Sequence, residues 1–93
     1  MIASFRDSET AKLWRTGKSR KLPPELQRRA FRKLALVNAA VALENLRVPP
    51  SNHLEALQGN RAGQHSIRVN DQYRICFQWR DGNAYAVEMV DYH

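Results

Sequence analysis

Hydrophobic side chains follow a helical period in the first half of the chain and alternate in the second half. Pro24 suits the first turn of a helix, and Glu25 suits the positive end of a helix dipole. From there the apolar residues fall within one quadrant of a helical projection: Leu26, Ala30, Leu34, Val37 and Val41. The pattern predicts a helix from Pro24 to about Ala42. A helix that continues through Leu46 would fit the same pattern.

Two shorter elements are predicted before this helix. Residues 2–5 have the composition of a short strand. Ser8, with Glu9 behind it, is suited to cap a helix that carries Leu13 and ends near Gly17.

After residue 51 the apolar period changes to two, which predicts strands at residues 66–69, 73–79 and 84–92. Asn70-Asp71 and Asp81-Gly82 are the expected turns between them. Helices followed by an antiparallel meander predict an α+β fold, with the N-terminal helices packed on one face of a small antiparallel sheet. The length of 93 residues and the lack of a linker-like stretch predict one domain over residues 1–93.

Alternation also assigns the two faces of the predicted sheet. An in-register meander without a bulge would send Arg68, Arg74 and Tyr92 to the face that the helices leave open. The other face would build the core from the apolar side chains of the three strands: Ile67, Val69, Tyr73, Ile75, Phe77, Trp79, Tyr85, Val87 and Met89.

The charge is strongly basic, with a net of +6 and a pI near 10.1. Such a balance favours a nucleic-acid partner, although an anionic membrane surface or an acidic protein would also fit. Residues 1–50 hold eleven basic and four acidic side chains, a net of +7. Opposite its apolar side, the long helix carries four basic residues: Arg28, Arg29, Arg32 and Lys33. This basic face is either exposed to solvent only or binds RNA or a protein partner.

Several classes of protein are disfavoured by what the sequence lacks. It has no apolar stretch long enough for a membrane span and no secretory signal, so we expect a cytoplasmic protein. Cys76 lies in a strand-forming run and is expected to be a buried thiol rather than a nucleophile. His53, His65 and His93 are not at metal-ligand spacing, so we expect neither a metal nor another cofactor.

Metal-free cleavage of RNA needs an acid, a base and positive charge near the scissile phosphate. Arg68 and Arg74 suit the charge, and Tyr92 can donate, accept or stack on a base. His93 can act as acid or base near neutrality, and Asp91 could orient either neighbour. Asp91, Tyr92 and His93 could equally be the end of a strand without a catalytic role. Their spacing alone does not decide between the two interpretations.

Three segments together resemble the HigB toxins of the RelE/ParE superfamily of bacterial toxin–antitoxin modules. They are residues 59–77, from Gly-Asn-Arg-Ala-Gly to Tyr-Arg-Ile-Cys-Phe, the hairpin at residues 81–85, and the terminal Asp91-Tyr92-His93. The resemblance is nearly continuous over residues 54–93 and covers the helical middle in pattern only.

This resemblance implies a RelE-like, microbial-RNase-like fold and an mRNA interferase that cuts message on the ribosome and inhibits growth. It implies a HigA-like helix-turn-helix antitoxin, contact with operator DNA only through the antitoxin complex, and no membrane partner. The family's catalytic roles carry over to four residues: Arg74, Asp91, Tyr92 and His93. Arg61 and Arg68 would contact RNA.

The sequence departs from the resemblance just upstream. Family members have Leu-His-Pro-Leu-Lys-Gly where this chain has Leu-Glu-Ala-Leu-Gln-Gly at residues 54–59. Glu55 thus replaces a catalytic-site histidine, and Gln58, which we expect to contact RNA, replaces a lysine. Either Glu55 acts as the base, or His93 does, or the chain is a weak nuclease. The alternatives from other classes are a non-enzymatic ParE-like toxin that poisons DNA gyrase, and a basic protein that represses its own operon with its partner.

Overall fold

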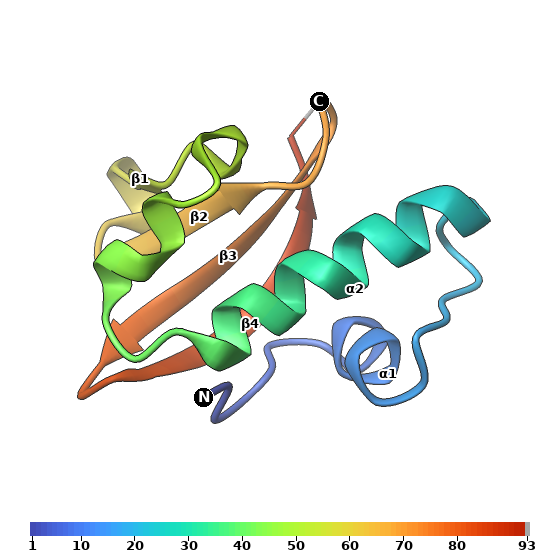
Figure 1. Cartoon of the computed structure of the whole chain (residues 1–93), viewed down its shortest axis with the longest axis horizontal. Coiled ribbons are helices and arrows are strands. Elements are labelled where there is room, and N and C mark those ends of the chain that lie inside the picture. Colours follow the sequence, from blue (N-terminus) through green and yellow to red (C-terminus); the bar gives the residue numbers. More distant parts are fainter. Residues whose placement is uncertain (93) are drawn as a thin grey trace.

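The computed structural model describes residues 1–92 and contains helices on one side of an antiparallel sheet (Figure 1). The strands are adjacent in the order β1-β2-β3-β4. The predicted α+β class is therefore confirmed. The elements are α1 (Ser8–Thr16), α2 (Pro24–Ala39), η1 (Leu43–Arg47), η2 (Pro50–Asn52), β1 (Glu55–Ala56), η3 (Gly59–Arg61), β2 (Gln64–Arg68), β3 (Tyr73–Arg80) and β4 (Asn83–Asp91).

The core lies between α2 and one face of the sheet. α2 buries the apolar positions that its helical period predicted: Leu26, Ala30, Leu34 and Val37. The sheet contributes Ile67, Ile75, Phe77 and Val87, all fully buried. Burying each such side chain contributes about 1.5–3 kcal/mol to stability. α1 joins this layer through Trp14, whose ring stacks on Phe31 of α2 with 5.2 Å between ring centroids.

The prediction that α2 continues to Ala42 was wrong. The helix ends at Ala39, and Val41 is 80% exposed. The reason is a competing side chain, because the Asn45 carboxamide oxygen accepts hydrogen bonds from the backbone N–H groups of Val41 and Ala42. A local side-chain acceptor of this kind offers the backbone an alternative to the helical ladder.

The cap of α1 also differs by one residue. Asp7, not Ser8, has extended backbone angles, and its carboxylate accepts from the N–H of Thr10 at 3.0 Å. The predicted end at Gly17 is confirmed, because this glycine adopts a left-handed φ of 76° and donates to the carbonyl of Leu13.

Two features of the sheet edges were not anticipated. The short strand β1 pairs with β2 and extends the meander to four strands. Residues 2–5 do not form a continuous strand, since they meet β4 in two isolated parallel bridges, Ile2 to Ala84 and Phe5 to Val87. Between the bridges, the N–H of Ala86 donates to the Ser4 hydroxyl instead of to a backbone carbonyl.

A β-bulge in β4 overturns one predicted face assignment. Cys76 pairs with Glu88 and Gln78 pairs with Tyr85, so two residues of β4 face one of β3. Ala86 takes up the extra residue with a φ of 52°. Tyr85 therefore lies on the open face with Gln78, while Val87 stays in the core.

Candidate functional site on the open face of the sheet

Register brings four side chains into one row across the open face of the sheet. Glu55 pairs with Ser66, Ser66 with Cys76, and Cys76 with Glu88, so the row crosses all four strands. Directly paired residues of antiparallel strands point to the same side. The row therefore has a carboxylate at each end and two small, fully buried side chains, Ser66 and Cys76, in the middle.

Arg74 occupies the next position along β3 and is held by several contacts. Its Nε donates to the Ser66 hydroxyl at 2.7 Å, and its Nη2 donates to the carbonyl of His53 at 2.6 Å. The same nitrogen lies 3.6 Å from a carboxylate oxygen of Glu55. The Arg74 side chain is 12% exposed and that of Glu55 is 54% exposed. The cation is thus fixed, and the carboxylate beside it is open to a ligand.

Arg61 forms the second arginine–carboxylate pair of this face. It leaves η3 and donates through Nη1 to Glu88 at 2.7 Å and to Gln64 at 3.1 Å. The hydrogen bond to Glu88 raises the pKa of Arg61. Glu88 also meets Arg6 at 3.6 Å. Arg61 is therefore anchored above the middle of the sheet by groups from two strands.

Tyr92 closes the face at the end of β4, as alternation predicted. Its hydroxyl lies 4.0 Å from the Cys76 sulfur, and its own side chain remains partly exposed. Burial raises the pKa of Tyr92, and the neighbouring Cys76 raises it further. The phenol therefore keeps its proton at neutral pH and is available as a hydrogen-bond donor. Cys76 is fully buried, as predicted, and burial raises the pKa of its thiol.

The remaining predicted site residues lie around this centre. Arg68 pairs with Arg74 across β2 and β3 and forms an ion pair with Asp71 of the adjoining turn. Gln58 is exposed and caps η3, accepting from the N–H of Arg61 through its carbonyl. Asp91 pairs with Tyr73, so it points away from the open face, and its carboxylate accepts from the Gln72 side chain at 3.1 Å. His93 lies outside the described residues.

Three groups near Arg74 and Arg61 were missed in the sequence, namely the Ser66 hydroxyl, the His53 carbonyl and the Glu88 carboxylate. Glu88 could have been found, because period two in β4 puts it on the same face as Tyr92. The His53 carbonyl had no sequence signal. His53 has a left-handed φ of 44°, which is what turns its carbonyl toward β3.

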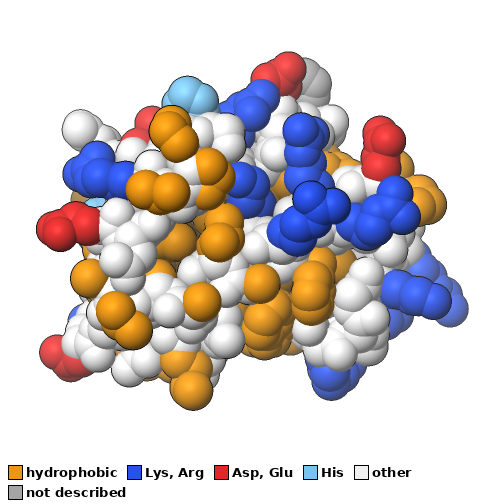
Figure 2. Space-filling model, in the orientation of Figure 1, with side chains coloured by type: hydrophobic (Ala, Val, Ile, Leu, Met, Phe, Trp, Pro, Cys, Tyr) orange, Lys and Arg blue, Asp and Glu red, His pale blue; other side chains and the backbone are white. Residues whose placement is uncertain are grey.

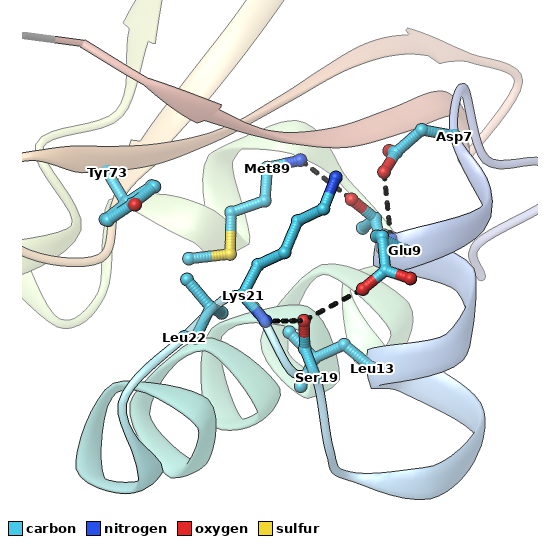
Figure 3. A pocket seen from close by; sticks show the side chains of 9 residues that line it. Asp7, Glu9, Leu13, Ser19, Lys21, Leu22, Tyr73 and Met89 are labelled. Atoms are coloured by element: carbon cyan, nitrogen blue, oxygen red, sulfur yellow. Dashed lines mark hydrogen bonds between the residues drawn. The ribbon is translucent and has the colours of Figure 1, made fainter.

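A separate pocket of about 160 Å³ lies between α1, the α1–α2 loop and the core face of the sheet (Figure 3). Several of its polar groups are engaged locally: Asp7 caps α1, and Glu9 accepts from the Ser19 hydroxyl at 3.1 Å. None of the predicted site residues lines it. Within residues 1–92, the structure has no cluster of three His, Cys, Asp or Glu side chains suited to a metal ion. No helix in this range is long and apolar enough to cross a membrane.

The arrangement of helices and strands has counterparts among solved structures. Crystal structures of a YafQ mutant and of YafQ, both from E. coli, match with TM-scores of 0.63 and 0.60. In each case the match covers 99% of this chain and 94% of the other at 12% sequence identity. The chain therefore shares the fold of YafQ.

Sequence comparison identifies the family within this fold. Residues 3–93 match the family described as "RelE-like toxin of type II toxin-antitoxin system HigB". Toxin HigB-1 of Vibrio cholerae serotype O1 is 44% identical over 85 residues, which is 90% of each chain. Endoribonuclease HigB of Proteus vulgaris is 31% identical over 93 residues, the full length of both. The chain belongs to the HigB-like family of type II toxins, a membership that implies an antitoxin partner.

Proposed function

We propose that this protein is an mRNA endoribonuclease that cuts messages on the ribosome without a metal ion and so inhibits translation and growth. The main support is the Arg74–Glu55 pair, a fixed guanidinium 3.6 Å from an exposed carboxylate on an open sheet face. A cation for the phosphate and an acceptor for a proton are two of the groups that this reaction needs. The name of the Proteus vulgaris relative, Endoribonuclease HigB, agrees with this chemistry.

The reaction begins at the ribose 2′-OH beside the scissile phosphate. Glu55 accepts the 2′ proton while the 2′ oxygen forms a bond to phosphorus. The bond from phosphorus to the 5′ oxygen then breaks, and His93 supplies the proton that this oxygen needs. The products are a 2′,3′-cyclic phosphate and a 5′-hydroxyl end.

Charge develops on the phosphate during this step, and two arginines of the open face offset it. Arg74 is the nearer to Glu55, and Arg61 approaches from the opposite side of the row. Pre-positioned cations are effective because they do not reorganise when the charge appears. Tyr92, which keeps its proton, donates a hydrogen bond to the phosphate or stacks on a base. Asp91 positions the end of β4 through Gln72.

Mapping the 5′ ends of cellular mRNA after induction tests this function. We expect new 5′-hydroxyl ends inside translated frames, and we expect them to vanish when translation initiation is blocked. Arg74→Ala should abolish the cuts and relieve growth arrest. Arg80→Ala is the matched control, because Arg80 lies on the same strand but packs over the Tyr85 ring, 4.2 Å from its centroid.

Three results would contradict the proposal or its site. Cuts that persist without translation would remove the ribosome from the mechanism. Growth arrest without new mRNA ends, accompanied by gyrase-dependent DNA breaks, would favour the ParE-like alternative. Equal toxicity of the Arg74→Ala and Arg80→Ala variants would exclude Arg74 from the site.

A further inference from the structure

A groove of about 640 Å³ lies on the helical side of the molecule, between the first half of α2 and the β2–β3 turn. Figure 2 shows Lys and Arg side chains gathered above α2, toward this turn. The groove is distinct from the open-face site, since it shares no lining residue with it. Three arginines of α2, Arg28, Arg29 and Arg32, form one wall. Asn70 and Gln72 of the turn and Tyr73 at the start of β3 form the other.

Three arginines and one carboxylate line this groove, so its net charge is positive. Among residues 1–92, the ion pairs involve basic residues outside α2, and Arg28, Arg29 and Arg32 take part in none of them. Burial lowers the pKa of the neighbouring Lys33, and the charges of Arg29 and Arg68 lower it further. Within the described chain, Glu25 is the carboxylate that lines the groove. The three guanidinium groups are therefore available to an anion.

The groove is connected to the candidate site through the β2–β3 turn. Gln72 lines the groove, its side chain donates to Asp91 at 3.1 Å, and its carbonyl accepts from the N–H of Tyr92 at 2.7 Å. An RNA strand that leaves the open face beside Tyr92 would cross this turn and meet the arginines. Arg28 and Arg32 are one helical turn apart, about 6 Å along the axis. They thus present successive cations along one line.

We propose that this groove binds the phosphate backbone of RNA. Guanidinium groups pair with phosphates in a planar, two-pronged geometry that suits such a wall. A protein partner would use apolar or aromatic anchors at the centre of its interface. Here Leu26 of the helix wall is buried and Tyr73 is partly buried, whereas three arginines line the groove. The inference rests on the proposed function, because the RNA is the message being cut, which continues from the open face past Tyr92 to the groove.

Binding to a non-cleavable RNA tests the groove independently of cleavage. We would compare the triple variant Arg28→Gln, Arg29→Gln, Arg32→Gln with the control Lys12→Gln, Lys18→Gln, Arg20→Gln. Both lose three positive charges, but the control residues line a different surface beside α1. The probe is a fluorescent single-stranded 2′-O-methyl RNA of about 20 nucleotides, titrated by anisotropy at several salt concentrations. Thermal unfolding checks that both variants are folded.

The groove variant should bind the probe at least ten-fold more weakly than the control at low salt. Each phosphate contact contributes about 0.7 to the slope of log K against log salt for single strands, so its slope should fall by about 2. Sedimentation with 70S ribosomes, with and without bound message, identifies the source of the RNA. If the groove variant binds more weakly only when message is present, the message is the occupant. An equal weakening without message would overturn this assignment in favour of ribosomal RNA.

Equal slopes for the two triple variants would overturn the inference. So would a groove variant that keeps its RNA slope but no longer co-purifies with the cognate antitoxin, which would make the groove a protein interface. A different result would reject the proposed function itself, namely a wild-type protein that makes no cuts in message. A cleaving wild type whose groove variant has an unaltered slope rejects the groove alone.

Discussion

Arg61 reaches from η3 over the sheet and donates to Glu88 of β4 at 2.7 Å. The two residues come from segments 27 positions apart, and their pairing spans the middle of the open face. Glu88 is itself 15% exposed and is also approached by Arg6. A carboxylate so placed restrains the rotamers of Arg61, which lowers the entropic cost of positioning its charge on a phosphate.

Glu88→Gln should therefore slow cleavage without weakening RNA binding. The neutral side chain holds Arg61 less firmly, while the face becomes more positive. We expect kcat to fall about ten-fold, equivalent to about 1.4 kcal/mol of transition-state stabilisation, with KM unchanged or lower. Cleavage of message on purified translating ribosomes measures both constants. Asp81→Asn, which removes an exposed carboxylate at the β3–β4 turn, is the control. A rise in KM at constant kcat would reject a positioning role.

The sequence resemblance aligns Glu55 with a histidine of the HigB toxins, and two substitutions of Glu55 should have opposite effects on cleavage. Glu55→Gln keeps the shape but removes the proton acceptor, so cleavage should fall at least ten-fold. Glu55→His replaces the carboxylate with another proton acceptor, an imidazole, so cleavage should be retained. Cleavage that is unchanged in Glu55→Gln would leave His93 as the base.

Tyr92 is expected to shield the Cys76 thiol. Burial is the largest cause of the raised Cys76 pKa, so the thiol is protonated at pH 8 and reacts slowly. Tyr92→Ala should open the site and increase the rate of iodoacetamide alkylation at least ten-fold. Tyr85→Ala is the control, because Tyr85 lies on the same face but packs with Arg80. Rapid alkylation of the wild-type protein would show that Tyr92 does not cover the thiol.

The parts of the site that follow from periodicity could be predicted from the sequence. Alternation along β3 and β4 was sufficient to predict that Arg74 and Tyr92 lie on the open face. The helical period was sufficient to predict the buried side of α2. Both patterns repeat over many residues, so burial enforces them strongly.

Features that no repeating pattern in the sequence encodes could not be predicted. The Asn45 side chain ends α2 early, and the bulge at Ala86 turns Tyr85 to the other face. The contacts of Arg74 depend on the left-handed backbone of His53, and those of Arg61 depend on the path of the η3 loop. These arrangements join segments distant in sequence, and no repeat in the chain records them.

Asn52 should contribute strongly to the stability of the segment that leads into β1. It is fully buried, its amide donates to the carbonyls of Leu46 and Val48, and its oxygen accepts from Lys33 at 2.6 Å. Asn52→Ala leaves these groups without partners, so we expect a loss of about 1–3 kcal/mol for each buried group left unsatisfied, partly recovered by entering water. Asn52→Asp keeps the acceptor for Lys33 and should lose less. Urea unfolding measures the free energy of unfolding of each variant. Asn60→Ala, at an exposed position of η3, is the control and should change this free energy by less than about 0.5 kcal/mol. Equal stability of Asn52→Ala and Asn60→Ala would mean that water replaces the Asn52 contacts at no cost.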